Sequence, residues 1–544
     1  MTGLLLDERT LFDRSDAELT LRAMLTHAAD GVGTVSVGPT SMSWTEFARL
    51  VDRRAAGLLR LGVLPGDRVA SLMTDRIECL ELMFATATVG AVWVPLGPFL
   101  KGRFLRHQLL DAEPTVLVVD RPGWRESAPA LTDCSSLRWL VHVEDSDGLP
   151  DVTVPTQPWA SIDDARPQPF AQVDGRMVAA ILYTSGTTGP AKGCMMSHSY
   201  FAKAGGVHGT TFGVRAEDVV HSAFPLFHGA ALNIVMVAVN AGASYRSPGT
   251  FSATTYWRDV RATGTTVIVG AGAMAHALLA RPVDDTDCDH TVRLAEWIPL
   301  TATTQDAFSR RFGVEVLSEH YGQTECMMIT LADPEGTRNR SSLGPPSLLT
   351  EVAIMGDDGR LVPDGTVGDI VVRPRTSSAM FDGYWRNPEA TVRAWRGLWH
   401  HTGDYGRRDP DGFLHFIDRR DDCVRRRGEN VSSLEVEAAI RELPAIADAA
   451  ILAVPSSMSE DDIKAVLVLE PGTRLEPAEL FEAFASALPY YAVPRYVDIV
   501  EALPRTPNMK IRKYELRDRG HGPDTWDFES MGFTVSRERR RATS

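Results

Sequence analysis

The sequence predicts an α/β protein of two domains. The larger, N-terminal domain is expected to contain mixed and parallel sheets with helices, followed by a β-rich subdomain, and the smaller C-terminal domain to be α+β. The first reason is length, because 544 residues exceed what one hydrophobic core usually supports. The second is that strand-like and helix-like segments alternate early in the chain, which favours parallel pairing. The third is that short strands and turn signals dominate from Val352 onward.

The elements follow from local patterns. Ser43-Trp-Thr-Glu46 is a capping box, and apolar residues at helical spacing follow it, so a helix should begin there. The next expected elements are strands at 68–73, 92–95 and 115–119 and helices at 77–88 and 103–110.

A charge-dense connector at 418–422 suits a domain boundary, so we place the domains at 1–420 and 421–544. In the second domain we expect helices at 435–441 and 477–488 and strands at 449–454, 465–469 and 496–500.

Composition excludes several classes of protein. The net charge of −15 argues against a general binder of nucleic acid or anionic membranes. Six scattered cysteines without a Cys-x-x-Cys pair suggest neither a disulfide framework nor a zinc site, and fit a reducing cytoplasm. No signal peptide or membrane-spanning apolar run is evident. We therefore expect a cytoplasmic protein.

The most informative stretch runs from Tyr183 to Gly193 and reads Tyr-Thr-Ser-Gly-Thr-Thr-Gly-Pro-Ala-Lys-Gly, after a strand-like run at 177–183. Its glycines let backbone N–H groups converge, and its hydroxyls and single lysine add donors, which suits a polyphosphate. An ordinary hairpin connection is the alternative, and the Walker pattern is absent. The candidate phosphate-binding residues are Thr184, Ser185, Gly186, Thr187, Thr188, Gly189 and Lys192.

Two further motifs carry carboxylates. Tyr321-Gly-Gln-Thr-Glu325 follows a strand-like run at 314–317, and a carboxylate in a turn at a strand end suits Mg²⁺ beside a triphosphate. Thr402-Gly-Asp404 reads as a turn whose aspartate could accept two hydrogen bonds from ribose hydroxyls. The simpler interpretations are a solvated acid and a turn-forming aspartate.

Taken together and in order, these motifs resemble those of the adenylate-forming superfamily, which contains acyl-CoA synthetases, adenylation domains and luciferases. The resemblance spans about residues 43–533. Within the superfamily the chain looks most like acyl-CoA ligases of the crotonobetaine/carnitine-CoA ligase type. The strings that carry this are Phe381-Asp-Gly-Tyr-Trp-Arg-Asn-Pro388, Arg425-Arg-Arg-Gly-Glu-Asn-Val-Ser-Ser433 and Asp524-Thr-Trp-Asp527.

The resemblance implies roles for the nucleotide-binding residues. Tyr321, within the string that includes Gly322, would lie against adenine, while Thr324 would bind a phosphate oxygen and Glu325 would bind Mg²⁺. Asp404 and Arg419 would hold the ribose.

It also implies roles for residues around the acid and the acceptor. His228, in Pro225-Leu-Phe-His-Gly229, occupies the acid-pocket position. Lys510 would be the catalytic lysine on a mobile small domain that rotates about Asp421, although Met509 stands where the family usually has glycine. The pantetheine thiol of CoA would approach the segment formed by Gly428, Glu429 and Asn430.

The chain departs from the family in one place. Where the family has a small-residue loop lining the acid pocket, this sequence reads Glu296-Trp-Ile-Pro-Leu-Thr-Ala302. Trp297 either belongs to the core beside a rearranged loop, or fills the pocket so that only a small or unusual acid fits.

The expected activity is AMP-forming ligation: ATP and Mg²⁺ activate a carboxylic acid, and CoA accepts it. A carrier-protein phosphopantetheine arm is another possible acceptor. One alternative is a diazotase that forms an adenylate of nitrite and diazotises an aryl amine. Another is a nucleotide-binding homologue that has lost catalysis. The sequence leaves the acid, the acceptor and the oligomeric state open.

Overall fold

The computed structural model describes residues 14–166, 169–184, 190–356, 358–419, 423–426, 429–456, 460–504, 511 and 513–535. The chain divides into two units. The larger is made of Met1–Pro98, Gln108–Tyr183 and Gly193–Asp418, and the smaller of Phe99–His107, Thr184–Lys192 and Arg419–Ser544. The domain limits 1–420 and 421–544 stay a prediction.

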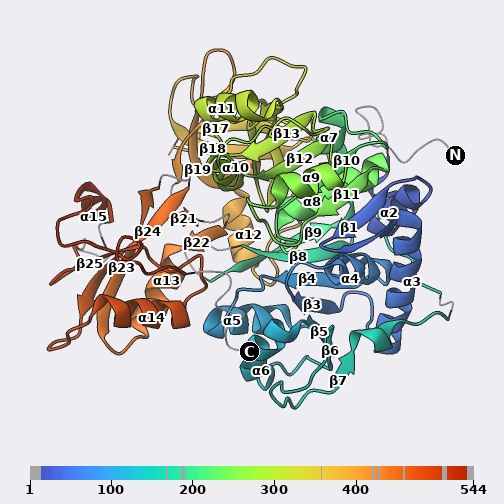
Figure 1. Cartoon of the computed structure of the whole chain (residues 1–544), viewed down its shortest axis with the longest axis horizontal. Helices are drawn as coiled ribbons and strands as arrows, with labels where there is room; N and C mark the ends of the chain where they lie inside the picture. Colours follow the sequence, from blue (N-terminus) through green and yellow to red (C-terminus); the bar gives the residue numbers. More distant parts are fainter. Residues whose placement is uncertain are drawn as a thin grey trace. The chain divides into compact units, whose positions relative to one another are not determined.

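The first seven-stranded sheet has the order β7-β6-β5-β3-β4-β8-β9, and its pairs from β7 to β8 are parallel (Figure 1). The alternation of strand and helix between residues 68 and 119 predicted the parallel pairing, but not the order of the strands. Its strands are β3 (Arg68–Leu72), β4 (Val92–Leu96), β5 (Val116–Val119), β6 (Trp139–His142), β7 (Thr156–Pro158), β8 (Val178–Thr184) and β9 (Lys192–Ser197). The helices between them are α4 (Ile77–Thr88), α5 (Gly102–Ala112) and α6 (Arg121–Leu131), with the 3₁₀ turn η2 (Trp159–Ile162) after β7.

The second seven-stranded sheet has the order β14-β13-β12-β10-β11-β1-β2. Its pairs are parallel except β1–β2, a hairpin that joins the sheet through β11, where Val35 lies opposite Tyr245. The strands are β1 (Thr34–Val37), β2 (Thr40–Ser43), β10 (Val219–Ser222), β11 (Ser244–Ser247), β12 (Val267–Ala271), β13 (Leu294–Ile298) and β14 (Glu315–Leu317).

Helices complete the core of the larger unit. The capping box predicted at Ser43 is confirmed: the Ser43 hydroxyl accepts from the Glu46 N–H, and the Glu46 carboxylate accepts from the Ser43 N–H. Helices α7 and α8 are buried along almost their whole length, which matches the apolar sequence of α8. The helices are η1 (Asp16–Glu18), α2 (Leu21–Ala29), α3 (Trp44–Arg60), α7 (His198–Thr211), α8 (Gly229–Ala241), α9 (Tyr256–Ala262), α10 (Gly272–Leu279) and α11 (Ala302–Phe312).

A hairpin and a four-stranded sheet follow. The hairpin consists of β15 (His320–Gln323) and β16 (Cys326–Leu331). The sheet has the order β17-β18-β19-β20, with β17 (Thr350–Met355), β18 (Gly368–Pro374), β19 (His400–Arg408) and β20 (Leu414–Arg419). Helix α12 (Pro388–Ala394) and the 3₁₀ turn η3 (Arg396–Leu398) lie between β18 and β19. This sheet is the β-rich subdomain predicted from the turn signals after Val352.

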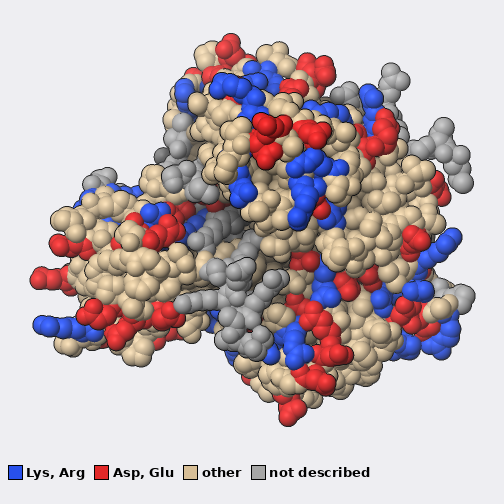
Figure 2. Space-filling view, in the orientation of Figure 1, with Lys and Arg blue, Asp and Glu red and all other residues tan. Residues whose placement is uncertain are grey.

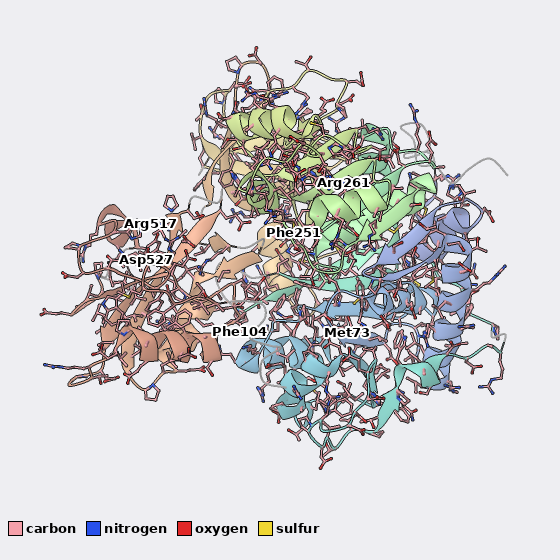
Figure 3. The ribbon with its side chains drawn as sticks, viewed as in Figure 1. Met73, Phe104, Phe251, Arg261, Arg517 and Asp527 are labelled. Atoms are coloured by element: carbon pink, nitrogen blue, oxygen red, sulfur yellow. The ribbon has the colours of Figure 1, made fainter. Side chains whose placement is uncertain are left out.

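The smaller unit is α+β and has its own core, in which Ile451, Phe484 and Val497 are fully buried. Its sheet has the order β23-β24-β25-β26. The Asp527 carboxylate, labelled in Figure 3, pairs with the Arg495 guanidinium at 3.0 Å. The elements are β21 (Cys423–Arg426), β22 (Glu429–Ser432), α13 (Ser433–Arg441), β23 (Ile446–Pro455), β24 (Asp461–Leu469), α14 (Pro477–Ala487), β25 (Tyr496–Ile499), α15 (Lys513–Asp518) and β26 (Trp526–Asp527).

Acidic and basic side chains are interspersed on the face shown in Figure 2. Among the described residues, no helix combines the length and apolar character needed to span a membrane.

Candidate active site

The β15–β16 hairpin presents the Tyr-Gly-Gln-Thr-Glu motif. Thr324 and Glu325 form its two-residue turn, as the sequence predicted for a carboxylate at a strand end. Gly322 is required because a Cβ at this position would overlap the carbonyl oxygen of Met327 on the opposite strand. The motif thus combines a backbone constraint at the glycine with a turn that carries the half-buried glutamate.

Tyr321 and Asp404, 83 residues apart in sequence, are in direct contact. The Tyr321 hydroxyl donates to Asp404 Oδ2 at 2.6 Å, and Gln323 Nε2 donates to the same oxygen at 3.0 Å. Gln323 Nε2 also lies 2.9 Å from the carbonyl oxygen of Thr402. Two motifs that the sequence analysis assigned to one nucleotide therefore meet in space.

The expectation that Thr402-Gly-Asp404 forms a turn is wrong, because these residues lie inside β19. Their pairing with β18 shifts register between Asp369 and Val371, so Ile370 alone faces three residues of β19. Gly403 has φ 75°, and the Thr402 hydroxyl donates to the Ile370 carbonyl at 2.7 Å. The residues that favour a turn therefore produce a bulge-like irregularity within β19. Such an irregularity changes the direction of the side chains that follow it, here that of Asp404.

Two tyrosines that the sequence analysis did not single out hold the hairpin turn. The Tyr384 hydroxyl donates to Glu325 Oε1 at 2.7 Å, and burial together with the Glu325 charge raises the pKa of Tyr384. The Tyr200 hydroxyl donates to the Thr324 carbonyl at 3.1 Å and accepts from the Met327 N–H at 2.7 Å. Tyr384 lies in the segment Phe381–Pro388, which resembles the family. That resemblance was the signal in the sequence that could have pointed to Tyr384.

The glycine-rich stretch lies between two neighbouring strands of the first sheet. Thr184 ends β8 and Lys192 begins β9. The other candidate residues of this stretch, Ser185 to Gly189, lie outside the described residues.

His228 is half-buried and is the N-cap residue of α8. The next residue, Gly229, lies so close to β16 that a Cβ there would approach the Met327 side chain to 2.6 Å. The start of α8 therefore abuts the strand that follows the hairpin turn.

Several predicted residues belong to the smaller unit or to its connection. Lys510, Asp421 and Gly428 lie outside the described residues. For Arg419, Glu429 and Asn430 the structure describes the backbone: Arg419 ends β20, and the other two begin β22. The roles assigned to all six stay predictions.

Lys513, shortly after Lys510, is fixed to α13. Its ammonium group lies 2.7 Å from Glu437 Oε1 and donates to the Ser433 hydroxyl at 2.7 Å. The chain that follows Lys510 is thereby anchored to the smaller unit.

Trp297 is fully buried in an aromatic cluster of the larger unit. Its ring centroid lies 5.5 Å from that of Phe308 and 6.0 Å from that of Tyr256, and the Tyr256 ring in turn contacts Phe251, labelled in Figure 3. This packing matches the interpretation of Trp297 as a core residue. Its role in a substrate pocket stays a prediction.

The neighbouring residue, Glu296, belongs to a buried polar cluster that the sequence analysis missed. Its carboxylate lies between His208 on α7 and His320 on β15, at 3.2 Å and 2.8 Å. Burial raises the pKa of Glu296, but the two histidines outweigh it and lower this pKa to about 2. Burial lowers the pKa of His320, and Glu296 outweighs that effect and raises it.

Comparisons with known proteins agree with this architecture. The family described as AMP-binding enzyme matches residues 26–385, and the AMP-binding enzyme C-terminal domain matches residues 435–510. The crotonobetaine/carnitine–CoA ligases of Salmonella paratyphi B and Salmonella typhi are each 31% identical over 493 residues, which cover 87% of this chain and 93% of theirs.

Solved structures show the same fold. The amide bond synthetase McbA from Marinactinospora thermotolerans has a TM-score of 0.80 at 24% identity, over 91% of this chain and 99% of its own. ATP-bound MatB from Rhodopseudomonas palustris has a TM-score of 0.64 at 27% identity, over 94% of this chain and 98% of its own.

The fold, the meeting of the Tyr321 and Asp404 motifs and these matches define the class of protein. The chain belongs to the AMP-binding, adenylate-forming ligase family, as the resemblance implied.

Proposed function

We propose that this chain activates a carboxylic acid with ATP and transfers the acyl group to CoA. The contact between Tyr321 and Asp404 is the observation that carries the proposal. The base and the sugar of one nucleoside are covalently adjacent, so the side chains that recognise them must be adjacent as well. The 31% identity to CoA ligases supports CoA as the acceptor.

In the first half-reaction, a carboxylate oxygen of the acid attacks the α-phosphorus of ATP. The bond from this phosphorus to the bridging oxygen breaks, and its electron pair leaves with pyrophosphate. Such a reaction depends on positioning and charge neutralisation more than on covalent help from the protein. We assign the β- and γ-phosphates to the Thr184–Lys192 stretch, the ribose to Asp404 and Arg419, and the developing charge to Lys510.

Glu325 fits the binding of Mg²⁺. It lies in the hairpin turn, and the Tyr384 hydroxyl fixes its Oε1, so the orientation of the carboxylate is set before the metal binds. Bound Mg²⁺ would neutralise charge on the triphosphate.

In the second half-reaction, the CoA sulfur attacks the acyl carbon, and the bond from this carbon to the AMP oxygen breaks. The thiol proton is released, and the products are the thioester and AMP. We assign the approach of the thiol to the segment from Gly428 to Asn430, and His228 to the acid.

Pyrophosphate release measured over a panel of carboxylic acids and nitrite, each with CoA, with an aryl amine or with neither, tests the proposal. ATP- and acid-dependent release with formation of a thioester supports it. Release that yields an amide, or nitrite-dependent release that yields a diazonium product, would replace CoA ligation by amide synthesis or by diazotisation. Absence of release under every condition would leave nucleotide binding without catalysis.

The Lys510→Ala variant tests the assignment of the lysine. Because this residue is assigned to charge that develops at the α-phosphate, adenylation should fall about 10²–10³-fold. Transfer from supplied acyl-adenylate should change less than about tenfold. Arg474→Ala, an exposed cation in the same unit, is the matched control and should leave both rates unchanged. Equal losses in both half-reactions would contradict the assignment.

A further inference from the structure

Three side chains of the larger unit converge on a buried point. Glu296 lies on β13, His208 on α7 and His320 on β15, and one ligand atom from each lies within 4.8 Å of the other two. Glu296 and His208 are each about 1% exposed. These are oxygen and imidazole ligands supplied by three separate elements of the fold.

The hydrogen bonds within the cluster leave it incomplete. Among the described residues, His208 Nε2, Glu296 Oε2 and Asn233 Oδ1 have no hydrogen-bond partner, although all three atoms are buried. His208 Nε2 and Glu296 Oε2 lie 3.2 Å apart, but their alignment does not make a hydrogen bond. Unpartnered buried polar atoms are costly, so His208 Nε2 and Glu296 Oε2, which face each other, indicate a missing ligand between them.

We infer that Glu296, His208 and His320 form a site for a divalent transition metal, with Zn²⁺ the ion that best fits two imidazoles and one carboxylate. Zinc sites with three protein ligands of this kind keep a fourth position open. None of the ligands is a cysteine, which explains why the cysteine pattern indicated no zinc.

The groups behind the two histidines suit metal ligation. His320 Nε2 lies 3.0 Å from the Met327 carbonyl oxygen, so this nitrogen donates and Nδ1 faces Glu296 and the proposed metal. Asn233 Nδ2 is placed 2.8 Å from His208 Nδ1, while Asn233 Oδ1 has no partner among the described residues. The two ends of a carboxamide are interchangeable by a 180° rotation, which brings the unpartnered oxygen onto Nδ1. Nδ1 then carries the proton, and Nε2 keeps its lone pair for the metal.

Charge favours an anion at the fourth position. One glutamate and one divalent ion leave a net charge of +1, since both imidazoles bind as neutral groups. A hydroxide or a small anionic ligand would neutralise the site. His320, with 12% of its side chain exposed, is the most accessible of the three ligands.

This site is separate from the proposed nucleotide site. His320 and Tyr321 are consecutive in β15, and their side chains lie on opposite faces of the strand. His320 contacts Glu296, whereas Tyr321 contacts Asp404. The metal can therefore be tested by binding alone, whatever the outcome of the activity assays.

The test is a titration of the full chain with Co²⁺, after removal of any affinity tag and of bound metal with a chelator. Co²⁺ reports its ligands through visible d–d absorption. One equivalent should bind with the intense bands of a four- or five-coordinate site, and Zn²⁺ should displace it. Metal binding should also raise the unfolding temperature, because only the folded chain presents the site. Absence of these bands and of stoichiometric binding in the wild type overturns the inference, even if no variant can be purified.

Variants localise the ion. Glu296→Gln should weaken Co²⁺ binding at least about 100-fold, and Asn233→Leu, behind His208, about 10–100-fold. The matched control is His221→Asn, because His221 is a fully buried histidine paired with Asp259 at 3.2 Å elsewhere in the same sheet. It should leave Co²⁺ binding unchanged. Binding that is equal in the wild type and Glu296→Gln would show an adventitious ion only and would overturn the site.

Discussion

Asp404 is held in position by two side chains of β15. It is about 3% exposed, and two neutral donors from β15 share one of its oxygens. Both donors set the position of the carboxylate. In the proposed function its charge would strengthen the hydrogen bonds that it accepts from ribose hydroxyls.

Replacing Asp404 by Asn should lower kcat/KM for ATP by about 10–100-fold. The shape is kept, whereas one or two charge-assisted hydrogen bonds are weakened, each of which contributes about 1.5–3 kcal/mol. Steady-state kinetics at varied ATP concentration measures the change. Asp364→Asn, at a half-exposed pair with Arg408, is the control and should have wild-type kinetics. A wild-type kcat/KM in Asp404→Asn would remove this residue from the nucleotide site.

His198 makes the stability of the fold depend on pH. Burial lowers its pKa to about 4, with Asp174 opposing the shift, and its Nδ1 accepts a hydrogen bond from the Leu21 N–H. The native pKa of His198 lies below the unfolded value of about 6.5, so its contribution to the free energy of unfolding is complete above pH 6.5. As pH falls toward 4, the unfolded chain binds a proton that the folded chain does not, and up to about 3 kcal/mol of stability is lost.

Denaturant unfolding between pH 7 and pH 4 checks this expectation. The His198→Gln variant should lose less stability over the interval than the wild type, because it has no imidazole to protonate. His521→Gln, at an exposed position of the smaller unit, should retain the wild-type slope. Parallel curves for wild type and His198→Gln would contradict the prediction.

Residues within contiguous motifs could be predicted from sequence, and residues brought together by the fold could not. Tyr321 and Glu325 stand in one five-residue string whose spacing is set by a hairpin. Glu296, by contrast, meets a histidine 88 positions earlier and another 24 positions later, so no local spacing could reveal the cluster. The signal that the sequence did offer for the cluster was Glu296 itself, a charged residue within an otherwise apolar strand.

At the scale of elements, prediction succeeded where local signals were strong. The helix predicted at 77–88 is α4, and the helix after Ser43 begins at its capping box. The prediction of a turn at Thr402–Asp404 was wrong. Gly and Asp favour turns, but the pairing of β19 with β18 keeps this segment in a strand. Tertiary pairing outweighed local propensity there.

Helices α7 and α8 pack closely enough to require a glycine. A Cβ on Gly205 would lie 2.5 Å from Met236 Cβ and 2.7 Å from its carbonyl carbon. Gly205→Ala should therefore lower the free energy of unfolding by about 1–3 kcal/mol through overpacking, despite the better helix propensity of alanine.

Gly209 offers a matched comparison on the same helix. A Cβ there would lie 3.4 Å from Val237 Cγ1, an ordinary contact, so Gly209→Ala should be neutral or slightly stabilising. Denaturant unfolding of both variants measures the difference. Equal stabilities for the two variants would show that the backbones move apart at little cost.

At the scale of the whole molecule, two separate cores predict more than one unfolding transition. Phe484 is fully buried in the smaller unit and Phe308 in the larger. Each substitution by alanine should cost about 3–5 kcal/mol within its own unit. In calorimetry of the full chain, Phe484→Ala should lower one transition and Phe308→Ala another. A single transition that both variants shift equally would mean that the units unfold together.

The α/β class and the α+β character of the C-terminal part could be predicted from sequence, because each depends on patterns within short segments. The order of the strands in the sheets could not. Strands β10, β11 and β12 are neighbours in the second sheet, but so are β11 and β1, which lie far apart in the chain. Local periodicity does not encode such long-range pairings.

The position of β1 beside β11 has a consequence for synthesis on the ribosome. The partners Thr34 and Ser244 are separated by 210 residues, so the β1–β2 hairpin emerges long before the strand that completes its pairing. At about 5–20 residues per second, the nascent chain carries an open strand edge for roughly 10–40 seconds. Open strand edges favour aggregation, so slower translation between β2 and β11 should increase aggregation of the nascent chain.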